Sequence, residues 1–170
     1  MEMNELLREQ DIVLQMPAKG KRSALAKAAG CMGERVGRGQ DAVLAAMLER
    51  ERLGSTGVGH GVAVPHGRLD GIDAPAAMLA TLERPVWFGS PDLAPVDLLL
   101  ALLWPKSDVA GFLPALSYFC RLLRQPELRE RLRASETAEE AYAWLQLSDK
   151  TATCQMDTQA ASGTFVSDIL

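Results

Sequence analysis

The sequence predicts a single α/β domain in which helices flank a mixed β-sheet. Helical patterns come first along the chain, extended apolar segments occupy its middle, and the last third is helical again. Its 170 residues suit one domain with a substantial core, and no internal repeat is visible. The hydrophobic fraction of 48% and the charged fraction of 24% are ordinary for a globular protein.

The first third of the chain is predicted to be mainly helical. Its regular segments are a short helix over 2–9, a short extended segment over Ile12–Met16, and helices over Lys19–Val36 and Gln40–Leu53. Apolar residues recur at helical spacing in the two long helices. Gly54 lies just past the second one, in the position where glycine commonly follows a helix C-terminus.

The middle of the chain carries the predicted strands. They are Val62–Val64, Ala76–Leu82, Val86–Phe88 and Val96–Trp104. The second and third are predicted as separate strands because Glu83-Arg84-Pro85 lies between them. The fourth is a nearly continuous apolar run, which is typical of a strand buried by helices on both faces of a sheet.

The last third predicts helices and then a tail. The helices cover Asp108–Arg124, Glu127–Arg133 and a segment through Ala141–Leu145. Thr137 and Glu140 form a capping box before the last of them. Beyond it the composition shifts to Thr, Ala, Gln and Ser without periodicity. We therefore predict a folded domain over 1–148 and a flexible tail over 149–170, with a short docking segment at Phe165–Leu170.

Charge and cysteine content exclude several classes of function. The net charge is −4, and lysine and arginine are spread along the chain, so nucleic acid is not an expected partner. Cys31, Cys120 and Cys154 fit no metal or disulfide framework, and the first two lie in apolar helical patterns that predict buried thiols. The odd cysteine count, the lack of an export signal and the short apolar runs predict a cytoplasmic protein that does not insert into a membrane.

The two histidines of the chain, His60 and His66, lie six positions apart in one glycine-rich segment over 54–67. Histidine offers a neutral nucleophilic nitrogen at pH 7, and glycines let backbone N–H groups approach an anion. Together they indicate phosphoryl chemistry. The segment lacks the lysine of a nucleotide-binding loop. Two histidines without further ligands make a weak zinc site, so neither a metal nor a cofactor is expected.

Arg50 extends the buried face of the predicted helix over Gln40–Leu53, because three apolar residues precede it at helical spacing. A buried guanidinium needs an anionic partner. A phosphoryl group would supply one if the following loop returns His66 towards this helix end. The alternative is a structural arginine paired with Glu51 or with another carboxylate of the core.

The roles of the loop residues stay open at this point. His66 follows Val64-Pro65 and is expected in a turn at a strand end, either as the nucleophile or as a surface-turn histidine bonded to the backbone. His60 is expected to line the loop or to donate a hydrogen bond to a phosphoryl group. The candidate phosphate-loop residues are Ser55, Thr56, Gly57, Gly59, His60 and Gly67. The two hydroxyls among them could instead satisfy the last carbonyls of the preceding helix.

These residues carry a resemblance to a known family. The segments Arg50–Gly59 and Val62–Gly67, with their GSTG and AVPHG motifs, resemble the active-site signature of the mannitol/fructose-type enzyme IIA proteins of the bacterial phosphoenolpyruvate-dependent phosphotransferase system. The run Pro95–Leu103 and the loop motifs are most similar to its nitrogen-regulatory branch. The similarity covers roughly 5–147, in order and with few gaps.

The resemblance implies a fold and a function. The fold is a mixed sheet flanked by helices, of the mannitol/fructose enzyme IIA type. His66 would accept a phosphoryl group from a histidine-containing phosphocarrier protein, and Arg50, sixteen positions earlier, would stabilise that group. The family usually uses Nε2, although the sequence does not select the ring nitrogen. An apolar rim is expected around His66, where the carrier's own histidine approaches.

The nitrogen-regulatory branch further implies control of other proteins by phosphorylation state, potassium-transport and sensor-kinase proteins among them. The alternatives are a sugar-specific enzyme IIA that feeds a separate permease, and an interaction module that is not phosphorylated. Sugar-transporting members often carry a second active-site histidine near the start of the helix after the main strand. The corresponding residues here, Val109–Pro114, contain no histidine. Two alternatives follow: His60 takes over part of that role, or no second histidine is needed.

Overall fold

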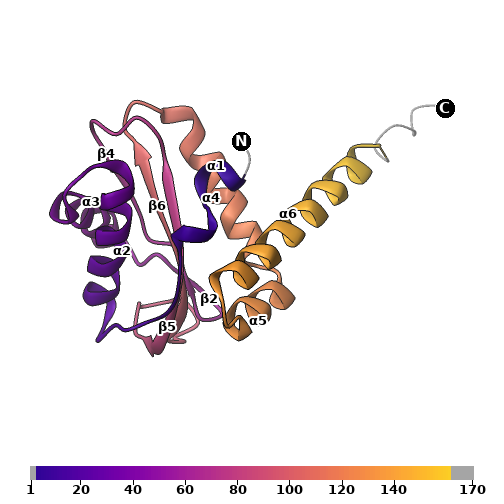
Figure 1. The fold of residues 1–170 in the computed structure, drawn as a ribbon, viewed down its shortest axis with the longest axis horizontal. Helices are drawn as coiled ribbons and strands as arrows, with labels where there is room; N and C mark the ends of the chain where they lie inside the picture. The colour runs from indigo at the N-terminus through magenta and orange to yellow at the C-terminus, as the bar shows by residue number, and fades with distance from the viewer. Residues whose placement is uncertain (1–2, 162–170) are drawn as a thin grey trace, which may run out of the picture.

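A computed structural model describes residues 3–161, in which helices cover both faces of a mixed β-sheet (Figure 1). The strands are β1 (Ile12–Met16), β2 (Gly57–Gly59), β3 (Val62–Ala63), β4 (His66–Leu69), β5 (Ala76–Val86) and β6 (Val96–Pro105). The helices are α1 (Met3–Leu6), the 3-10 turn η1 (Glu9–Asp11), α2 (Lys21–Val36), α3 (Gln40–Arg52), α4 (Val109–Leu122), α5 (Pro126–Ala134) and α6 (Ala138–Ala161).

Strand β6 is the centre of the sheet. The strand order is β1-β5-β6-β3-β2, and β4 pairs with β6 farther along the same edge as β3. Strand β5 runs antiparallel to β6, whereas β3 and β4 run parallel to it. Pro65 lies between β3 and β4, where its missing N–H interrupts donation to the sheet while its carbonyl still accepts from Leu102 at 2.9 Å. Two short parallel strands thus follow one another along β6.

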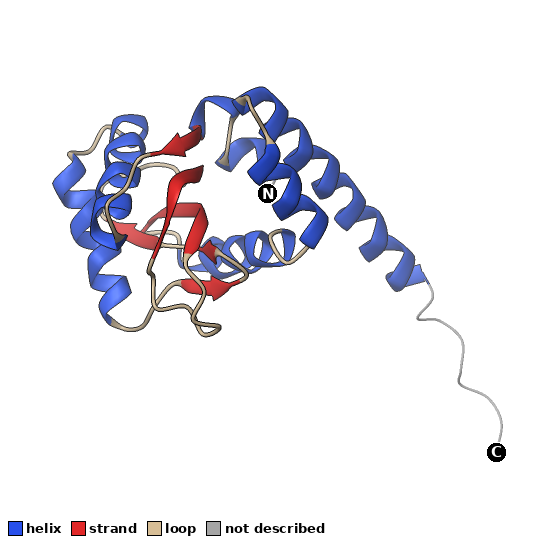
Figure 2. Cartoon of the chain, turned by 90° about the horizontal axis from the view of Figure 1, so that it is seen from below, coloured by secondary structure: helices blue, strands red, loops and turns tan. Residues whose placement is uncertain are grey.

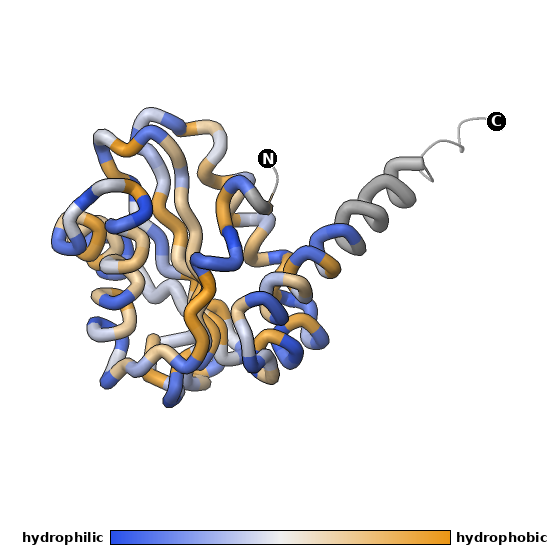
Figure 3. Tube along the Cα trace, viewed as in Figure 1, coloured by the Kyte–Doolittle hydropathy of each residue, from blue (hydrophilic) through white to orange (hydrophobic). Residues whose placement is uncertain are grey.

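Two hydrophobic cores lie on the two faces of the sheet. On β6, Leu98, Leu100 and Leu102 face the core beneath α4, α5 and α6, while the residues between them face the core beneath α2 and α3. Figure 2 shows the sheet between these two helical layers, and Figure 3 shows apolar residues along the strands with polar residues recurring on the helices. All residues of β6 except Asp97 are buried, which confirms the prediction of a strand covered on both faces.

Most of the predicted elements are confirmed within a few residues at their ends. They are β1, α2, α3, β3, β6, α4 and α5. The predicted cap at Thr137 is also present, because its Oγ1 accepts the Glu140 N–H at 3.1 Å. The Glu140 carboxylate accepts from the N–H of Glu136 rather than from Thr137, so the capping box is only half formed. The predicted helix over 2–9 is instead the short helix α1 followed by a 3-10 turn.

Three strand predictions need correction. The segments Ala76–Leu82 and Val86–Phe88 are not separate strands, because β5 continues through Glu83-Arg84-Pro85. These three residues are exposed, and the register with β6 shifts there, which lets a proline remain in a strand. Strands β2 and β4 were not predicted, since they are short and contain glycine. His66 therefore opens a strand rather than lying in a turn.

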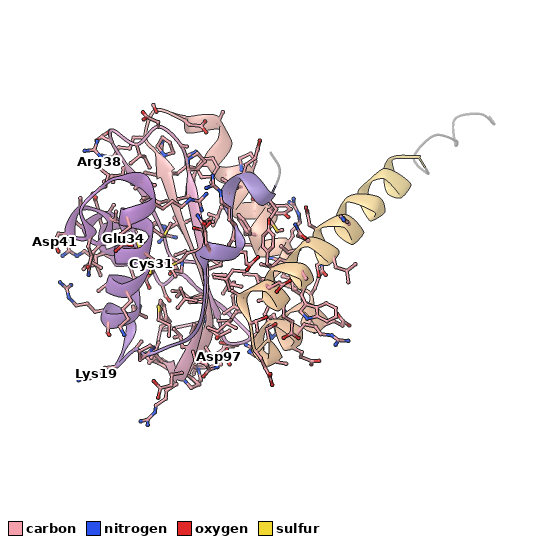
Figure 4. The ribbon with its side chains drawn as sticks, in the orientation of Figure 1. Lys19, Cys31, Glu34, Arg38, Asp41 and Asp97 are labelled. Carbon is pink, nitrogen blue, oxygen red and sulfur yellow. The ribbon has the colours of Figure 1, made fainter. Side chains whose placement is uncertain are left out.

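Two cysteine predictions have different outcomes. Cys31 is exposed, so its prediction as a buried thiol is wrong: the face of α2 that packs on the sheet is formed by residues such as Ala28 and Met32. Figure 4 labels Cys31 on this helix close to Glu34. Cys120 is half-buried, and burial raises the pKa of its thiol.

The C-terminal helix is longer than predicted. Helix α6 continues to Ala161 across the first part of the predicted tail and projects away from the sheet (Figure 1). No glycine or proline occurs between Pro126 and Gly163, so no residue of this stretch strongly opposes a helix. The Tyr118 hydroxyl donates to Asp149 Oδ1 at 2.6 Å and ties α4 to α6. The expected docking segment at 165–170 lies outside the described residues. Within 3–161, no helix is both long and apolar enough to cross a membrane.

Replacing Gly67 with alanine is expected to lower the free energy of unfolding by about 1–3 kcal/mol, as overpacking of a filled interior does. A Cβ there would lie 3.1 Å from both Ala46 Cβ and the Met47 backbone nitrogen, so α3 would have to shift. Urea-induced unfolding measures the loss. Gly30→Ala is the matched control, because its Cβ meets only the Gln40 side chain, at 3.4 Å, inside a helix that favours alanine. Equal stability of the two variants would contradict a tight α3–β4 crossing.

Candidate active site

Helix α3 crosses directly over strand β4, and this crossing brings Arg50 to His66. Arg50 lies in the last turn of α3, and His66 is the first residue of β4, where it pairs with Leu102 of β6. The two backbones approach closely because Gly67 has no side chain and its Cα faces Ala46. The His66 side chain is consequently buried, with the residue only 7% exposed.

The hydrogen bonds of His66 define which ring nitrogen is available. Nδ1 lies 2.9 Å from the carbonyl oxygen of Val64, an atom that can only accept, so Nδ1 carries the proton. Nε2 then holds a lone pair and accepts the Nε–H of Arg50 at 2.8 Å. Arg50 is held in place by a second bond, from Nη1 to the Gly54 carbonyl at 3.0 Å. The geometry thus presents Nε2 as the basic and nucleophilic atom.

Burial keeps the His66 ring neutral. Removal from water is the main cause that lowers the pKa of His66, because it penalises the imidazolium form. The Arg50 charge lowers the pKa further, whereas the hydrogen bond to the Val64 carbonyl and the charge of Glu51 raise it. The net direction is below the ordinary histidine value, so a neutral imidazole predominates at pH 7.

A shallow hollow of about 260 Å³ opens beside His66. It is lined by Ala46, Glu49, Arg50, Leu53, His66, Gly67, Arg68, Lys106 and Phe112. The Phe112 ring lies 5.4 Å from the His66 ring, tilted by 51°, and 6.0 Å from the Trp104 ring. Trp104 Nε1 donates to Asp108 Oδ2 at 3.0 Å, and Asp108 also caps α4. The start of α4 is thereby fixed against the histidine.

Apolar side chains stand exposed at this end of the molecule. Leu53 follows α3 and is 83% exposed, while Val109 and Leu113 lie on α4, on either side of Phe112 in sequence, and are 72% and 64% exposed. Large apolar side chains this exposed are common where another protein docks. Of these three side chains only Leu53 lines the hollow with His66, so the apolar rim stays a prediction.

Glu51 is occupied elsewhere and does not pair with Arg50. It accepts from Lys21 Nζ at 2.7 Å, from the Thr56 hydroxyl at 2.6 Å and from the Thr56 N–H at 3.2 Å. These bonds tie α2 and the start of the glycine-rich loop to the end of α3. Among the side chains that the structure describes, up to residue 150, no carboxylate forms an ion pair with Arg50, so the alternative of a structural ion pair is not found there.

The glycine-rich loop is mostly held away from the hollow. Of the six candidate phosphate-loop residues, Gly67 lines the hollow and the other five do not. Ser55 Oγ donates to the Phe88 carbonyl at 2.6 Å and accepts from the N–H of Gly57 at 3.1 Å. Thr56 is engaged by Glu51, as described above. The hydroxyls and the Gly57 amide are therefore satisfied within the protein.

His60 occupies the turn between β2 and β3, flanked by Gly59. Its φ of +56° is left-handed, its N–H donates to Asp92 Oδ2 at 2.7 Å, and its carbonyl accepts from Arg133 Nη2 at 2.7 Å. Arg133 also binds Asp97, which Figure 4 labels at the opposite end of the molecule from Arg38. Arg38 in turn binds the carbonyls of 70–71, just past β4. The structure thus separates the two histidines.

Arg68, Lys106 and Phe112 are among the residues of the hollow that sequence reasoning did not assign to the site. Arg68 follows His66 by two, so alternation along β4 would have placed both on one face, had the strand been predicted. Phe112 lies in the segment that lacks a second histidine, and the structure brings it to His66. Within the described part of the chain, no three His, Cys, Asp or Glu side chains are grouped to hold a metal ion.

The chain is similar to known proteins over nearly its whole described length. The family model for the phosphoenolpyruvate-dependent sugar phosphotransferase system, EIIA 2, matches residues 5–147. A nitrogen regulatory protein of Bradyrhizobium diazoefficiens is 38% identical over 152 residues, which cover 89% of this chain and 99% of that protein. One from Escherichia coli K12 is 42% identical over 101 residues, which cover 59% of this chain and 62% of that protein.

Solved structures show the same fold. The crystal structure of nitrogen regulatory protein IIA-Ntr from Neisseria meningitidis has a TM-score of 0.80 and 34% identity, and the match covers 84% of this chain and 98% of that one. IIA mannitol from Escherichia coli has a TM-score of 0.70 at 23% identity, with 82% of this chain and 98% of that one covered. The expected mannitol-type enzyme IIA fold is confirmed.

His66 is expected to titrate below the ordinary histidine pKa of about 6.5, with its proton on Nδ1 in the neutral form. Because the unfolded chain then binds the proton more readily, the contribution of His66 to stability is fully present above about pH 6.5 and is lost as the pH falls through the folded-state pKa. Long-range ¹H–¹⁵N spectra measure the tautomer and the midpoint. Urea unfolding of the wild type and of His66→Gln, compared as the pH falls below about 6.5, measures the contribution of His66 to the free energy of unfolding. A midpoint above the ordinary value would contradict the burial argument.

Proposed function

This chain belongs to the EIIA 2 family of the phosphoenolpyruvate-dependent sugar phosphotransferase system, and on that premise we propose that Nε2 of His66 accepts a phosphoryl group from a histidine-containing phosphocarrier protein. The observation that carries the proposal is the buried contact between Arg50 Nε and His66 Nε2 at 2.8 Å, on a ring whose other nitrogen is bonded to Val64. It supplies a neutral nucleophile and an adjacent cation; Glu49 also lines the hollow but forms no ion pair with Arg50.

The transfer follows from this arrangement. The lone pair of Nε2 attacks phosphorus while the phosphorus–nitrogen bond of the carrier breaks, and the carrier's imidazole leaves with the electron pair. The Val64 carbonyl accepts from Nδ1–H and stabilises the positive charge that the His66 ring gains as it gives up its lone pair. Phosphoryl transfer asks the protein mainly for in-line positioning and charge stabilisation, and in this proposal Arg50 and the Val64 carbonyl contribute the charge stabilisation.

Arg50 has a dual role in this proposal. In the unmodified protein its Nε–H occupies the lone pair of Nε2, so the incoming phosphoryl group must replace that bond. The guanidinium is anchored at the Gly54 carbonyl through Nη1 and therefore stays beside the reacting atoms. Its N–H groups then bind the phosphoryl oxygens, for which a guanidinium has the right planar, forked geometry.

We further propose that phosphorylation of His66 regulates which proteins the chain binds, and that it acts in the cytoplasm, where its carrier would meet it. The nitrogen regulatory relatives support this reading. A phosphoryl group adds up to about two negative charges to a surface that otherwise presents Arg50, Arg68 and Lys106. Such a reversal of local charge changes partner preference without a change of fold. Potassium-transport and sensor-kinase proteins are the first partners to examine.

His66→Ala is expected to abolish acid-labile phosphoryl labelling by phosphoenolpyruvate and the upstream phosphotransferases. His60→Asn is the matched control, because asparagine tolerates the left-handed backbone that His60 adopts. We expect it to slow labelling modestly at most, since the two histidines lie apart. Intact-mass spectrometry detects the added phosphoryl group. Full labelling of His66→Ala would eliminate His66 as the acceptor.

Arg50→Ala is expected to reduce the rate of phosphoryl transfer by about 10²–10³, as removal of a preorganised transition-state donor does. Arg50→Lys keeps the charge and should recover part of the rate, because it lacks the forked donors. Rapid-quench labelling gives the rate, and urea unfolding checks that both variants fold. A wild-type rate in a folded Arg50→Ala protein would make Arg50 a structural residue.

The regulatory reading predicts that captured partners distinguish the phosphorylated from the unphosphorylated chain, with a difference that shrinks as salt screens the added charge. Affinities measured by calorimetry at two salt concentrations test this. His66→Asp should imitate the phosphorylated form only in part, because one carboxylate carries less charge. Equal affinities across the partners would instead favour a relay to a sugar permease, the activity suggested by a fructose-specific EIIA component of Haloferax volcanii that is 35% identical over 98 residues.

A further inference from the structure

Arg68 is a second arginine of the hollow, and it reaches the hollow from the strand rather than from a helix. It follows His66 by two residues on β4, so both side chains project from the same face of the strand. Arg68 Nη2 donates to the backbone carbonyl of Lys106 at 2.8 Å, which fixes the guanidinium at the end of β6. Arg68 and Arg50 both line the hollow that contains the His66 ring.

Arg68 lacks the partners that a half-buried guanidinium usually has. Its Nε is buried and has no hydrogen-bond acceptor, and no carboxylate among the described side chains, which end at residue 150, forms an ion pair with it. Of the nearby carboxylates, Asp70 pairs with Lys106 Nζ at 2.9 Å, and Asp108 accepts from the start of α4 and from Trp104, two bonds that lower its pKa together with the Arg68 charge. Glu49 also lines the hollow but forms no ion pair with Arg68. Buried donors are nearly always paired, so one without a partner needs an explanation.

Four cations of the described chain have carboxylate partners. Lys21, Arg35, Lys106 and Arg133 each form an ion pair with a carboxylate. The two arginines of the hollow form none within the described chain, and they flank the same imidazole ring. Arg38 and Arg129 form no ion pair either, but they donate to backbone carbonyls. Arg68 differs because its Nε has no acceptor and its side chain lines the hollow, which points to an anion that arrives from outside.

We propose that Arg68 is a second phosphoryl-binding residue, whose free Nε–H binds an oxygen of the group on His66 while Arg50 binds from the α3 side. This inference rests on the proposed phosphorylation of His66. Two guanidinium groups on different elements can bind the oxygens of a transferring phosphoryl group from two directions, which one arginine does not. The Lys106 carbonyl holds Arg68 at the hollow in advance, and a shift of the side chain exposes its buried Nε–H to the phosphoryl group.

The test is the pKa of the phosphoryl group itself, measured by ³¹P NMR titration of the phosphorylated full chain. A cation within about 4–6 Å typically lowers the pKa of an anion by about 1–3 units, so Arg68→Gln should raise the phosphoryl pKa by about one unit. The transfer rate should fall about tenfold, the equivalent of one pKa unit. Arg84→Gln is the control, since it removes the same charge at an exposed position on β5, outside the hollow.

Arg68→Lys separates charge from geometry. It should keep most of the pKa effect and lose part of the rate, because lysine supplies no Nε–H in the arginine position. If Arg68→Gln fails to fold by urea unfolding, the rate of Arg68→Lys against Arg84→Lys carries the test. A phosphoryl pKa and rate in the Arg68 variants equal to those of the wild type would overturn the inference. Absence of any phosphoryl signal in the wild type would overturn the proposed function instead.

Discussion

The close crossing of α3 over β4 is the constraint on which the rest of this site depends. Gly67 lets the helix backbone approach to the distance at which Arg50 can bond the ring of His66. Both elements are fixed by the same core, because β4 pairs with the buried centre of the sheet and Val43 and Met47 bury the inner face of α3. A displacement of this helix by a few tenths of an ångström would therefore be felt first at the histidine.

The charges around His66 make an unfavourable electrostatic contribution to folding, which other parts of the fold must offset. His66 is held neutral in a largely apolar place, and two guanidinium groups beside it lack carboxylate partners among the described residues. Each condition is unfavourable for the unmodified protein, since unpaired charges near the interior are expensive to keep. Cores on both faces of the sheet stabilise the domain against this cost. An anion placed on the ring relieves it, so the same features that strain one state stabilise the other.

Sequence and structure agree that Arg50 and His66 meet, and they differ on the loop between these residues. Arg50 and His66 were predicted to meet, and they do. The glycine-rich loop was expected to cradle the ligand, yet the hydroxyls of Ser55 and Thr56 are bound within the protein, and His60 belongs to a turn held by Arg133. Glycine allows backbone conformations that a tight hairpin requires as well as an anion-binding loop, so a glycine-rich sequence does not distinguish the two.

The sequence by itself determined the layers and the chemical identity of the centre: apolar periodicity set the long helices and the buried strand, and one motif identified His66 with Arg50. Only the tertiary structure decided which ring nitrogen is free, because that depends on the carbonyl of Val64, and which side chains complete the hollow. Phe112 and Arg68 come from elements that meet His66 only after packing. Local sequence patterns predict which face of a segment is buried. The hollow lies between several segments, so its lining depends on how they pack and cannot be predicted from any one of them.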